Sequence, residues 1–305
     1  MRRARGTERA PRVQAAWSAG AGADLLHEAA GTEAGDVAPA RIVIATDPIC
    51  SRCWAMEPAL RRLRYHHGSR VAITRAYGGL LPRWAHFHDR EVGIRAPGDV
   101  VSHWSAVARH HGQPIDPSVW RTDPLASSYP PTIALHVVRH LVPALEEAYL
   151  RRLRHALFLE ARNVSREEVL IACAADVGVD WETFAAAYQA GAGAVAFSRE
   201  LTTLRRLGVH SFPTLLVAGP AQTEPLLLRG AQTYERLVAT LGRALGHTLP
   251  PDRWVTPMEA LAAYGTGTLR EFGELLGLDD AATAGALRAA GARVDELASG
   301  QLWRG

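Results

Sequence analysis

Two short β-branched runs with a helix-length segment between them form the first clear pattern along the chain. Residues 41–46 read Arg-Ile-Val-Ile-Ala-Thr, which predicts a buried strand, and residues 71–77 predict a second strand that ends at Gly78-Gly79. Residues 50–67 have apolar positions at helical spacing, and Pro58 should kink that helix one turn in. The pattern therefore predicts a β-α-β unit.

A long helical stretch follows this unit. From about residue 97 to residue 207 the apolar positions repeat with helical periodicity, and strand patterns are almost absent. One predicted helix, residues 165–177, begins at Ser165-Arg-Glu-Glu168, which matches a capping box. The other predicted helices are residues 100–111, 132–141, 144–161, 181–188 and 194–207.

The strand pattern returns after the helical stretch. Residues 214–218 and 225–229 predict two strands joined through Gly219-Pro220, as in a hairpin, and residues 233–245 predict a closing helix. The order strand, helix, strand, long helical segment, strand, strand, helix resembles that of an α/β thioredoxin fold. A large all-helical domain, at about residues 97–207, is then an insertion after the first β-α-β unit.

The two ends of the chain differ from this central part, which we place at residues 40–245. Residues 1–39 are rich in Ala and Gly with scattered charges, so we expect a disordered leader. Residues 246–257 contain three prolines and predict a linker. Residues 257–305 predict a compact helical module that resembles a winged helix and has a capping box at Thr268-Leu-Arg-Glu271.

Composition and charge argue against several classes of function. The 305 residues are 48% hydrophobic, which is enough for a substantial core. The net charge is only +3 and no long basic run follows the first dozen residues, so we expect no nucleic-acid partner. Arginines beside the N-terminus lack a following apolar segment, and no run is long enough to span a membrane. We therefore expect a soluble, cytoplasmic protein without a membrane partner.

Cys50 and Cys53 carry the strongest chemical signal. They stand where the first predicted strand gives way to a helix, and the only other cysteine is Cys173 in an apolar helical stretch. The free N–H groups and the dipole at a helix N-terminus can lower the pKa of a thiol there. The spacing also fits half of a zinc site, but a second close pair of ligands is missing, so we predict a redox pair with no metal and no cofactor.

Three segments together resemble the DsbA family of thioredoxin-like proteins. They are Asp47-Pro-Ile-Cys-Ser-Arg-Cys-Trp-Ala-Met-Glu-Pro58, Gly78-Gly79-Leu80 and Val209-His-Ser-Phe-Pro-Thr214. The resemblance covers roughly residues 41–245 and is closest to the cytoplasmic branch of FrnE-like proteins and SpxH-type protease adaptors.

This resemblance implies roles for four residues. Cys50 would be the attacking thiol and Cys53 the thiol that resolves a mixed disulfide. Pro213 would be a cis-proline that faces the disulfide. The peptide bond before it would turn Phe212 so that its backbone can pair with an extended substrate.

Four further residues around the pair are candidates for tuning or substrate binding. Ser51 and Arg52 separate the cysteines, and Arg52 either places a cation near both sulfurs or points into solvent. Asp47 either accepts a proton from Cys53 or caps the helix. Trp54 is either a packing residue or part of a substrate platform.

Three functions fit these observations. The first is a cytoplasmic thiol–disulfide oxidoreductase or isomerase that acts on protein or small-molecule thiols and disulfides. The second is an SpxH-like adaptor that delivers a regulator to a protease, with the helical insertion or the C-terminal module as the surface for its protein partner. The third is a glutathione-dependent isomerase or transferase, against which the retained cysteine pair argues.

Overall fold

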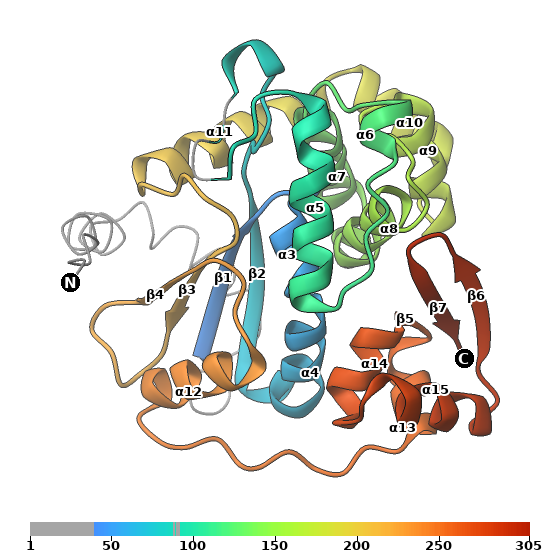
Figure 1. The fold of residues 1–305 in the computed structure, drawn as a ribbon. Helices are drawn as coiled ribbons and strands as arrows, with labels where there is room; N and C mark the ends of the chain where they lie inside the picture. The colour runs from blue at the N-terminus through green and yellow to red at the C-terminus, as the bar shows by residue number, and fades with distance from the viewer. Residues whose placement is uncertain (1–39, 88, 90–91) are drawn as a thin grey trace, which may run out of the picture.

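A four-stranded sheet lies at the centre of the chain in the computed structural model, which describes residues 40–87, 89 and 92–305 (Figure 1). The predicted leader at residues 1–39 lies outside the described residues. The strands are ordered β2-β1-β3-β4, with β1 and β2 parallel and the other neighbours antiparallel. They are β1 (Ala40–Thr46), β2 (Val71–Tyr77), β3 (Thr214–Ala218) and β4 (Leu226–Arg229).

Helices cover both faces of this sheet, which explains why the strands read as almost continuous apolar runs. Ile42 and Ile44 belong to one core with residues of α4 (Glu57–His67) and α12 (Tyr234–Leu245). Val43 and Ala45 belong to another core with Leu204 and Leu207 at the end of α11 (Ala192–Arg206). Side chains of β1 therefore alternate between the two layers.

The helix predicted at residues 50–67 is divided into α3 (Ser51–Ala55) and α4. A single helix with a kink at Pro58 was therefore the wrong prediction. Pro58 has no N–H to donate to the carbonyl of Trp54, and the N–H of Met56 donates to that carbonyl instead. Pro58 thus falls in the first turn of α4, where a missing N–H costs nothing.

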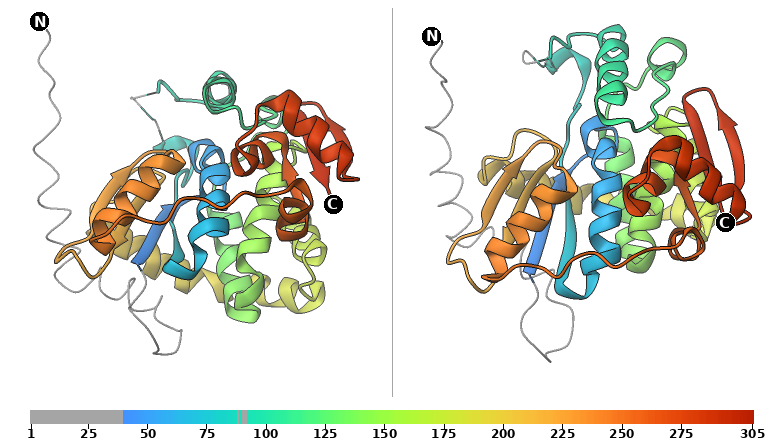
Figure 2. Two further views of the ribbon diagram at one scale, coloured as in Figure 1. Left: turned by 90° about the horizontal axis from the view of Figure 1, so that it is seen from below. Right: turned by 60° about the horizontal axis from the view of Figure 1, so that its bottom comes forward.

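The segment between β2 and β3 is mainly helical (Figure 2). Its apolar core also includes Ile49, before α3, and Trp54 and Ala55 at the end of α3. The capping box predicted at Ser165 is wrong, because the helix begins two residues later and the Ser165 hydroxyl donates to Asn163. The α-helices of this segment are α5 (Pro97–His111), α6 (Val119–Thr122), α7 (Tyr129–Leu141), α8 (Glu146–Phe158), α9 (Glu167–Asp176), α10 (Trp181–Gln189) and α11.

The C-terminal module combines helices with a small sheet, which is compatible with the predicted resemblance to a winged helix. Its capping box at Thr268 is present, with reciprocal bonds between Thr268 and Glu271. The strands are ordered β5-β7-β6, and α14 packs on α4 (Figure 2). The elements are α13 (Pro257–Tyr264), β5 (Thr266–Thr268), α14 (Leu269–Leu276), α15 (Asp280–Ala289), β6 (Arg293–Leu297) and β7 (Gly300–Arg304).

These layers confirm the predicted α/β class with a thioredoxin-like sheet. Among the described residues, none of the helices is both long and apolar enough to cross a membrane.

Candidate active site

Cys50 is the N-cap residue of α3, at the carboxyl end of the central strand β1. Its sulfur accepts a hydrogen bond from the backbone N–H of Cys53 at 3.3 Å, in the place where a Ser or Asp side chain usually caps a helix. Both cysteines are free thiols, 6% and 2% exposed. The chain therefore brings its two sulfurs together within one turn.

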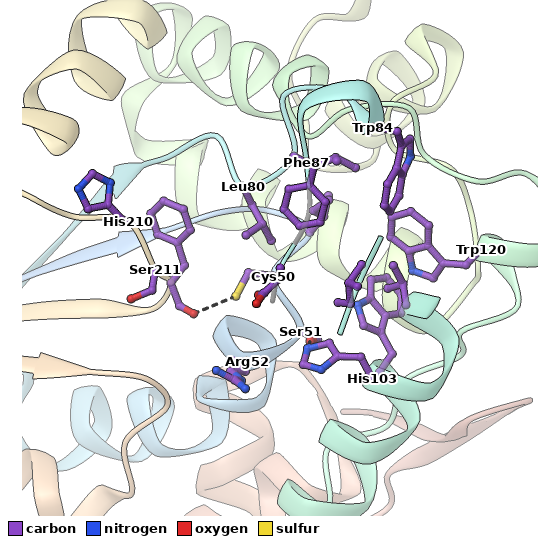
Figure 3. Close-up of a pocket in the computed structure, with 17 residues that line it drawn as sticks. Cys50, Ser51, Arg52, Leu80, Trp84, Phe87, His103, Trp120, His210 and Ser211 are labelled. Carbon is purple, nitrogen blue, oxygen red and sulfur yellow. Dashed lines mark hydrogen bonds between the residues drawn. The ribbon is translucent and has the colours of Figure 1, made fainter. Parts of the chain in front are cut away.

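The Phe212–Pro213 segment faces Cys50 from the start of β3. The Cys50 thiol donates to the carbonyl of Phe212 at 3.5 Å, and the Phe212–Pro213 peptide bond is cis (Figure 3). Gly78 makes this approach possible, because a Cβ at that position would lie 1.9 Å from the Phe212 ring. The segments predicted to form one site thus meet across the C-terminal ends of β1 and β2.

Asp47 is fully buried and joins three loops. Its carboxylate accepts from the N–H groups of Ile49 at 3.0 Å and Leu80 at 2.7 Å, and from the hydroxyl of Ser128 at 2.9 Å. Burial raises its pKa to about 6, although these bonds and the charge of Arg154 act in the other direction. Asp47 does not cap α3, since the sulfur of Cys50 occupies that position.

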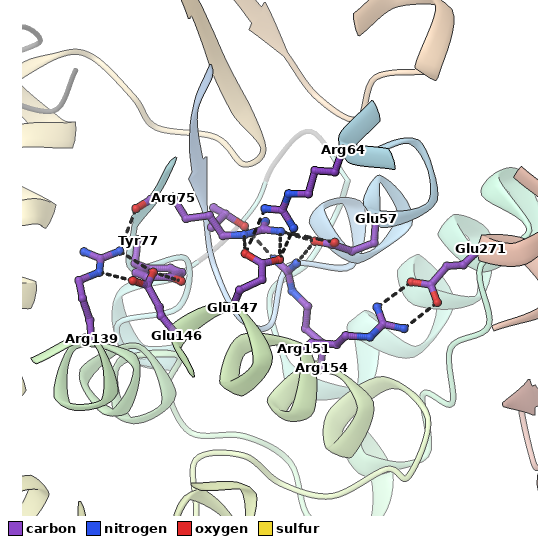
Figure 4. Close-up of polar contacts among 11 residues, drawn as sticks. Glu57, Arg64, Arg75, Tyr77, Arg139, Glu146, Glu147, Arg151, Arg154 and Glu271 are labelled. Carbon is purple, nitrogen blue, oxygen red and sulfur yellow. Dashed lines mark hydrogen bonds and ion pairs between the residues drawn. The ribbon is translucent and has the colours of Figure 1, made fainter. Parts of the chain in front are cut away.

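A set of ion pairs joins α4, β2 and α8 (Figure 4). Arg154 of α8 is 1% exposed, pairs with Glu57 and donates to the hydroxyl of Thr46 at 2.9 Å. Arg75 of β2 donates to Glu57 at 3.1 Å and to Glu147 at 2.7 Å. A permanent positive charge is thus held in a desolvated position from which it acts on Cys53, and solvent screens it little there.

The two thiols differ in acidity because their surroundings differ. Burial raises the pKa of Cys50, and the neighbouring Cys53 and the Asp47 carboxylate raise it further. Burial also acts upward on the pKa of Cys53, but the hydrogen bond from Cys50 and the charge of Arg154 outweigh it, so that pKa is lowered. The expectation that the helix N-terminus lowers the pKa of Cys50 is therefore wrong for the reduced pair, because desolvation is the larger effect.

A pocket of about 120 Å³ opens beside Cys50 and extends from Ser211 and Phe212 to the aromatic residues on the other side of that cysteine (Figure 3). Its walls come from the start of α3, the loop after β2, α5 and α6 of the insertion, and the segment before β3. Its polar lining includes Arg52, Asp89 and His103. The apolar lining consists of Ile49, Leu80, Leu81, Trp84, Phe87, Ile94, Val100, Trp104, Trp120 and Phe212.

Of the remaining predicted site residues, two line the pocket and one lies outside it. Ser51 and Arg52 line the pocket, with the Ser51 hydroxyl 3.4 Å from Nε2 of His103 and Arg52 exposed at the rim. Trp54 lies outside the pocket: it is fully buried, stacks on Phe158 and donates to the carbonyl of Pro114 at 2.9 Å. Of its two readings, packing residue and substrate platform, the first is the one that this position fits.

Sequence reasoning missed two kinds of residue here. Arg154 provides the positive charge that acts on Cys53, yet it lies about a hundred positions away in an ordinary amphipathic helix. Trp104 and Trp120 also lie apart in the insertion, and only contact across the fold makes them one wall with Trp84 of the preceding loop. Neither set leaves a spacing signal. Within residues 40–87, 89 and 92–305, no three His, Cys, Asp or Glu side chains are placed to hold a metal ion.

Comparison with known sequences agrees with this arrangement. A family model described as thioredoxin matches residues 44–239. A ClpXP adapter protein SpxH from Halalkalibacterium halodurans is 30% identical over 216 residues, which cover 70% of this chain and 70% of that protein. A protein of the same name from Shouchella clausii is 26% identical over 238 residues, 78% of this chain and 75% of that protein.

Two solved structures show the same fold. A putative protein disulfide isomerase from Nitrosomonas europaea superposes with a TM-score of 0.56 at 18% identity, covering 67% of this chain and 96% of the other. A probable DsbA oxidoreductase from Streptomyces coelicolor gives 0.54 at 19% identity, covering 71% and 94%. The fold around the cysteine pair is therefore that of the DsbA-like thioredoxin proteins.

Proposed function

This chain belongs to the thioredoxin family, and we propose that it is a thiol–disulfide oxidoreductase whose redox pair is Cys50 and Cys53. The observation that supports this most directly is the position of the Cys50 sulfur. It caps α3, faces the carbonyl of Phe212 and borders a pocket, with the second sulfur one turn away. Such a sulfur can be reached by a disulfide from the pocket side and by Cys53 from the helix side.

In the reduced pair the lowered pKa of Cys53 favours the thiolate on that sulfur, so the first step of the proposed reaction moves the negative charge from Cys53 to Cys50. The Cys50 proton passes to Cys53, which leaves a Cys50 thiolate held by the N–H of Cys53. This thiolate attacks one sulfur of a substrate disulfide, so that a mixed disulfide forms and the other substrate sulfur leaves as a thiolate. Cys53 then gives its proton to the departed substrate thiolate and attacks the Cys50 sulfur, which breaks the mixed disulfide and releases the second substrate thiolate. The substrate gains two electrons and the protein holds a Cys50–Cys53 disulfide. The reverse sequence oxidises a dithiol.

The neighbours of the pair have supporting roles in this proposal. Pro213 and Phe212 present a backbone edge to an extended substrate, as the carbonyl of Phe212 already accepts a bond from Cys50. Arg154 favours negative charge on Cys53, whereas Arg52 and Ser51 contact the substrate side of the pair. We propose that the partners are protein or small-molecule disulfides and thiols of the cytoplasm, with no cofactor.

Three single variants test this function. Cys50→Ser should reduce dithiothreitol-driven insulin reduction to the uncatalysed rate, because no nucleophilic sulfur remains at the pocket. Cys53→Ser should accumulate a mixed disulfide that mass spectrometry detects as the added mass of one substrate chain. Cys173→Ala is the control, since that thiol is buried in the insertion and should leave the rate unchanged. Unchanged turnover in Cys50→Ser contradicts the proposal.

A role as a protease adaptor is the second candidate, and the named relatives favour it. The proteins 30% and 26% identical to this chain are both called ClpXP adapter proteins. The chain also has a protein surface beyond the redox site: Trp254 and Met258, at the start of the C-terminal module, are 75% and 70% exposed. We propose that this adaptor function uses the C-terminal module rather than the thiols.

The adaptor candidate is tested with a variant that cannot perform the redox reaction. The tagged Cys50→Ser/Cys53→Ser protein is captured from cells beside the wild type, in dithiothreitol and in diamide, and bound ClpXP subunits are quantified. Equal capture by both forms, with loss in Trp254→Ala/Met258→Ala, supports the adaptor. Absence of ClpXP subunits from every capture contradicts it.

A further inference from the structure

We propose that the pocket beside Cys50 binds an aromatic side chain of the substrate, so that the protein prefers disulfides whose cysteine has an aromatic neighbour within two residues. This inference rests on the proposed oxidoreductase function and names its substrate class. Cys50 forms part of the pocket wall. A substrate bound to Cys50 through a disulfide therefore places its neighbouring side chains beside this pocket.

The geometry places the substrate chain between two different surfaces. On one side of Cys50 are Ser211 and Phe212, whose backbone can pair with an extended peptide (Figure 3). On the other side are Trp84, Phe87 and Trp120 (Figure 3). A peptide joined to Cys50 through its own cysteine therefore has a neighbouring side chain directed at these rings.

The rings form a wall that suits a flat apolar group. Trp84 meets Phe87 and Trp120 edge-on, with ring centroids 5.6 and 6.0 Å apart, and Trp104 meets Trp120 at 5.3 Å. Edge-to-face and offset contacts between aromatic rings are favourable beyond the area that they bury. The hydrogen bond from Trp84 to the carbonyl of Leu125, 2.8 Å long, keeps one wall in place.

Polar groups of the pocket are consistent with this occupant. The indole N–H of Trp120 is buried and has no hydrogen-bond partner in the part of the chain that the structure describes, so it can donate to a substrate carbonyl or hydroxyl. Burial, reinforced by the charge of Arg52, lowers the pKa of His103, which leaves this ring neutral at pH 7. The two charged residues of the lining, Arg52 and Asp89, are of opposite sign.

The test compares peptide disulfides that differ at one position. Four peptides place a single Phe one or two residues before or after one cysteine of an intramolecular disulfide, and a fifth has Gly at all four positions. Dithiothreitol returns the Cys50–Cys53 disulfide to thiols after each turnover, and each rate is divided by the uncatalysed rate. For at least one Phe position we expect kcat/KM to exceed that of the Gly peptide about 10-fold or more.

Variants locate the preference in this pocket. Phe87→Ala removes one ring from a partly exposed loop, and Val100→Phe fills the cavity from α5. Both should bring the Phe-to-Gly ratio toward one. Trp254→Ala, which removes an exposed ring in the linker before α13, should leave the ratio unchanged. A ratio that neither Phe87→Ala nor Val100→Phe lowers overturns the inference.

A disulfide without side chains separates this inference from the function on which it rests. Wild type and Cys50→Ser are compared on bis(2-hydroxyethyl) disulfide. If turnover depends on Cys50 but every Phe-to-Gly ratio lies within about twofold of one, the pocket inference is wrong and the oxidoreductase function stands. If turnover does not depend on Cys50 with any substrate, the function itself is wrong, and the substrate class is withdrawn with it.

Discussion

The two halves of the divided helix, α3 and α4, are built in opposite ways. At the start of α3, the sulfur of Cys50 has one backbone N–H and one carbonyl as polar contacts and borders a pocket. On α4, Arg61 pairs with Glu271 of the C-terminal module at 2.9 Å, and Arg151 of α8 holds the same carboxylate with two bonds of 2.8 Å (Figure 4). The start of α3 is therefore accessible from a pocket, whereas α4 is fixed to the C-terminal module by ion pairs.

Desolvation explains the difference. A buried charge is tolerated when partners occupy its hydrogen-bonding positions, and Glu271 and Arg61 have such partners in Arg151, Thr266 and Thr268. A thiol loses much less on burial, so Cys50 can remain without strong partners and exchange them for a substrate. We conclude that the module is anchored by electrostatics at a distance from the place where the chemistry occurs.

The largest expected effect is on the free energy of unfolding, when the ion pairs between α4 and the C-terminal module are disrupted. Glu271→Gln leaves Arg61 and Arg151 buried without their counter-charge and should lower the free energy of unfolding by about 3 kcal/mol. The control is Asp295→Asn, whose ion pair with Arg304 is about half exposed and should contribute less than about 1 kcal/mol. Urea unfolding measures both. Alkylation of Cys50 in the folded protein should keep its rate, and a parallel loss of that rate would show that the two halves are coupled.

The next effect concerns pH and the buried Asp47. Its pKa of about 6 in the folded chain lies about 2 units above the usual 3.8, which corresponds to about 3 kcal/mol. Between these values the folded chain keeps the proton that the unfolded chain loses. The contribution of Asp47 to stability is therefore present below about pH 4 and lost as the pH rises through about 6.

Asp47→Asn measures this contribution directly. The stability of the wild type minus that of the variant should fall by about 3 kcal/mol between pH 4 and pH 7. Asp99→Asn should give the opposite sign, because backbone N–H groups lower the pKa of the exposed Asp99. Asp47→Asn should also shift the alkylation of Cys50 to lower pH, since the Asp47 charge raises the pKa of that thiol. Parallel stability curves for Asp47→Asn and wild type would contradict the assignment.

The smallest expected effect concerns Arg52, whose exposed charge contrasts with the buried charge of Arg154. Arg52→Gln removes a cation at the exposed rim of the pocket, where salt screens it. We expect the alkylation rate of Cys50 at pH 7 and 0.15 M salt to change by less than about threefold. A change of tenfold or more would assign to Arg52 the electrostatic role that the structure gives to Arg154.

Local pattern was sufficient for the sheet strands, the last helix of the central domain and the capping box at Thr268, because these depend on residues close in the chain. Local pattern also predicted Cys50, Cys53 and Phe212 as site residues, because each belongs to a short segment with a recognisable motif. It failed at Pro58 and Ser165, where a second way to satisfy the backbone was available. The strands of the β6–β7 hairpin were not assigned by residue range within the winged-helix-like module, because short strands with mixed exposure give a weak periodicity.

Acidity and specificity were decided by packing in three dimensions. A pKa depends on how completely water is removed and on which charges remain, and Arg154 reaches Cys53 through space rather than along the chain. The aromatic wall of the pocket is likewise assembled from segments far apart, Trp84 and Trp120 among them. The periodicity of apolar residues along the chain is enough to predict helices and strands. Desolvation and electrostatic interactions depend on which helices and strands pack together, so they were decided by the tertiary structure.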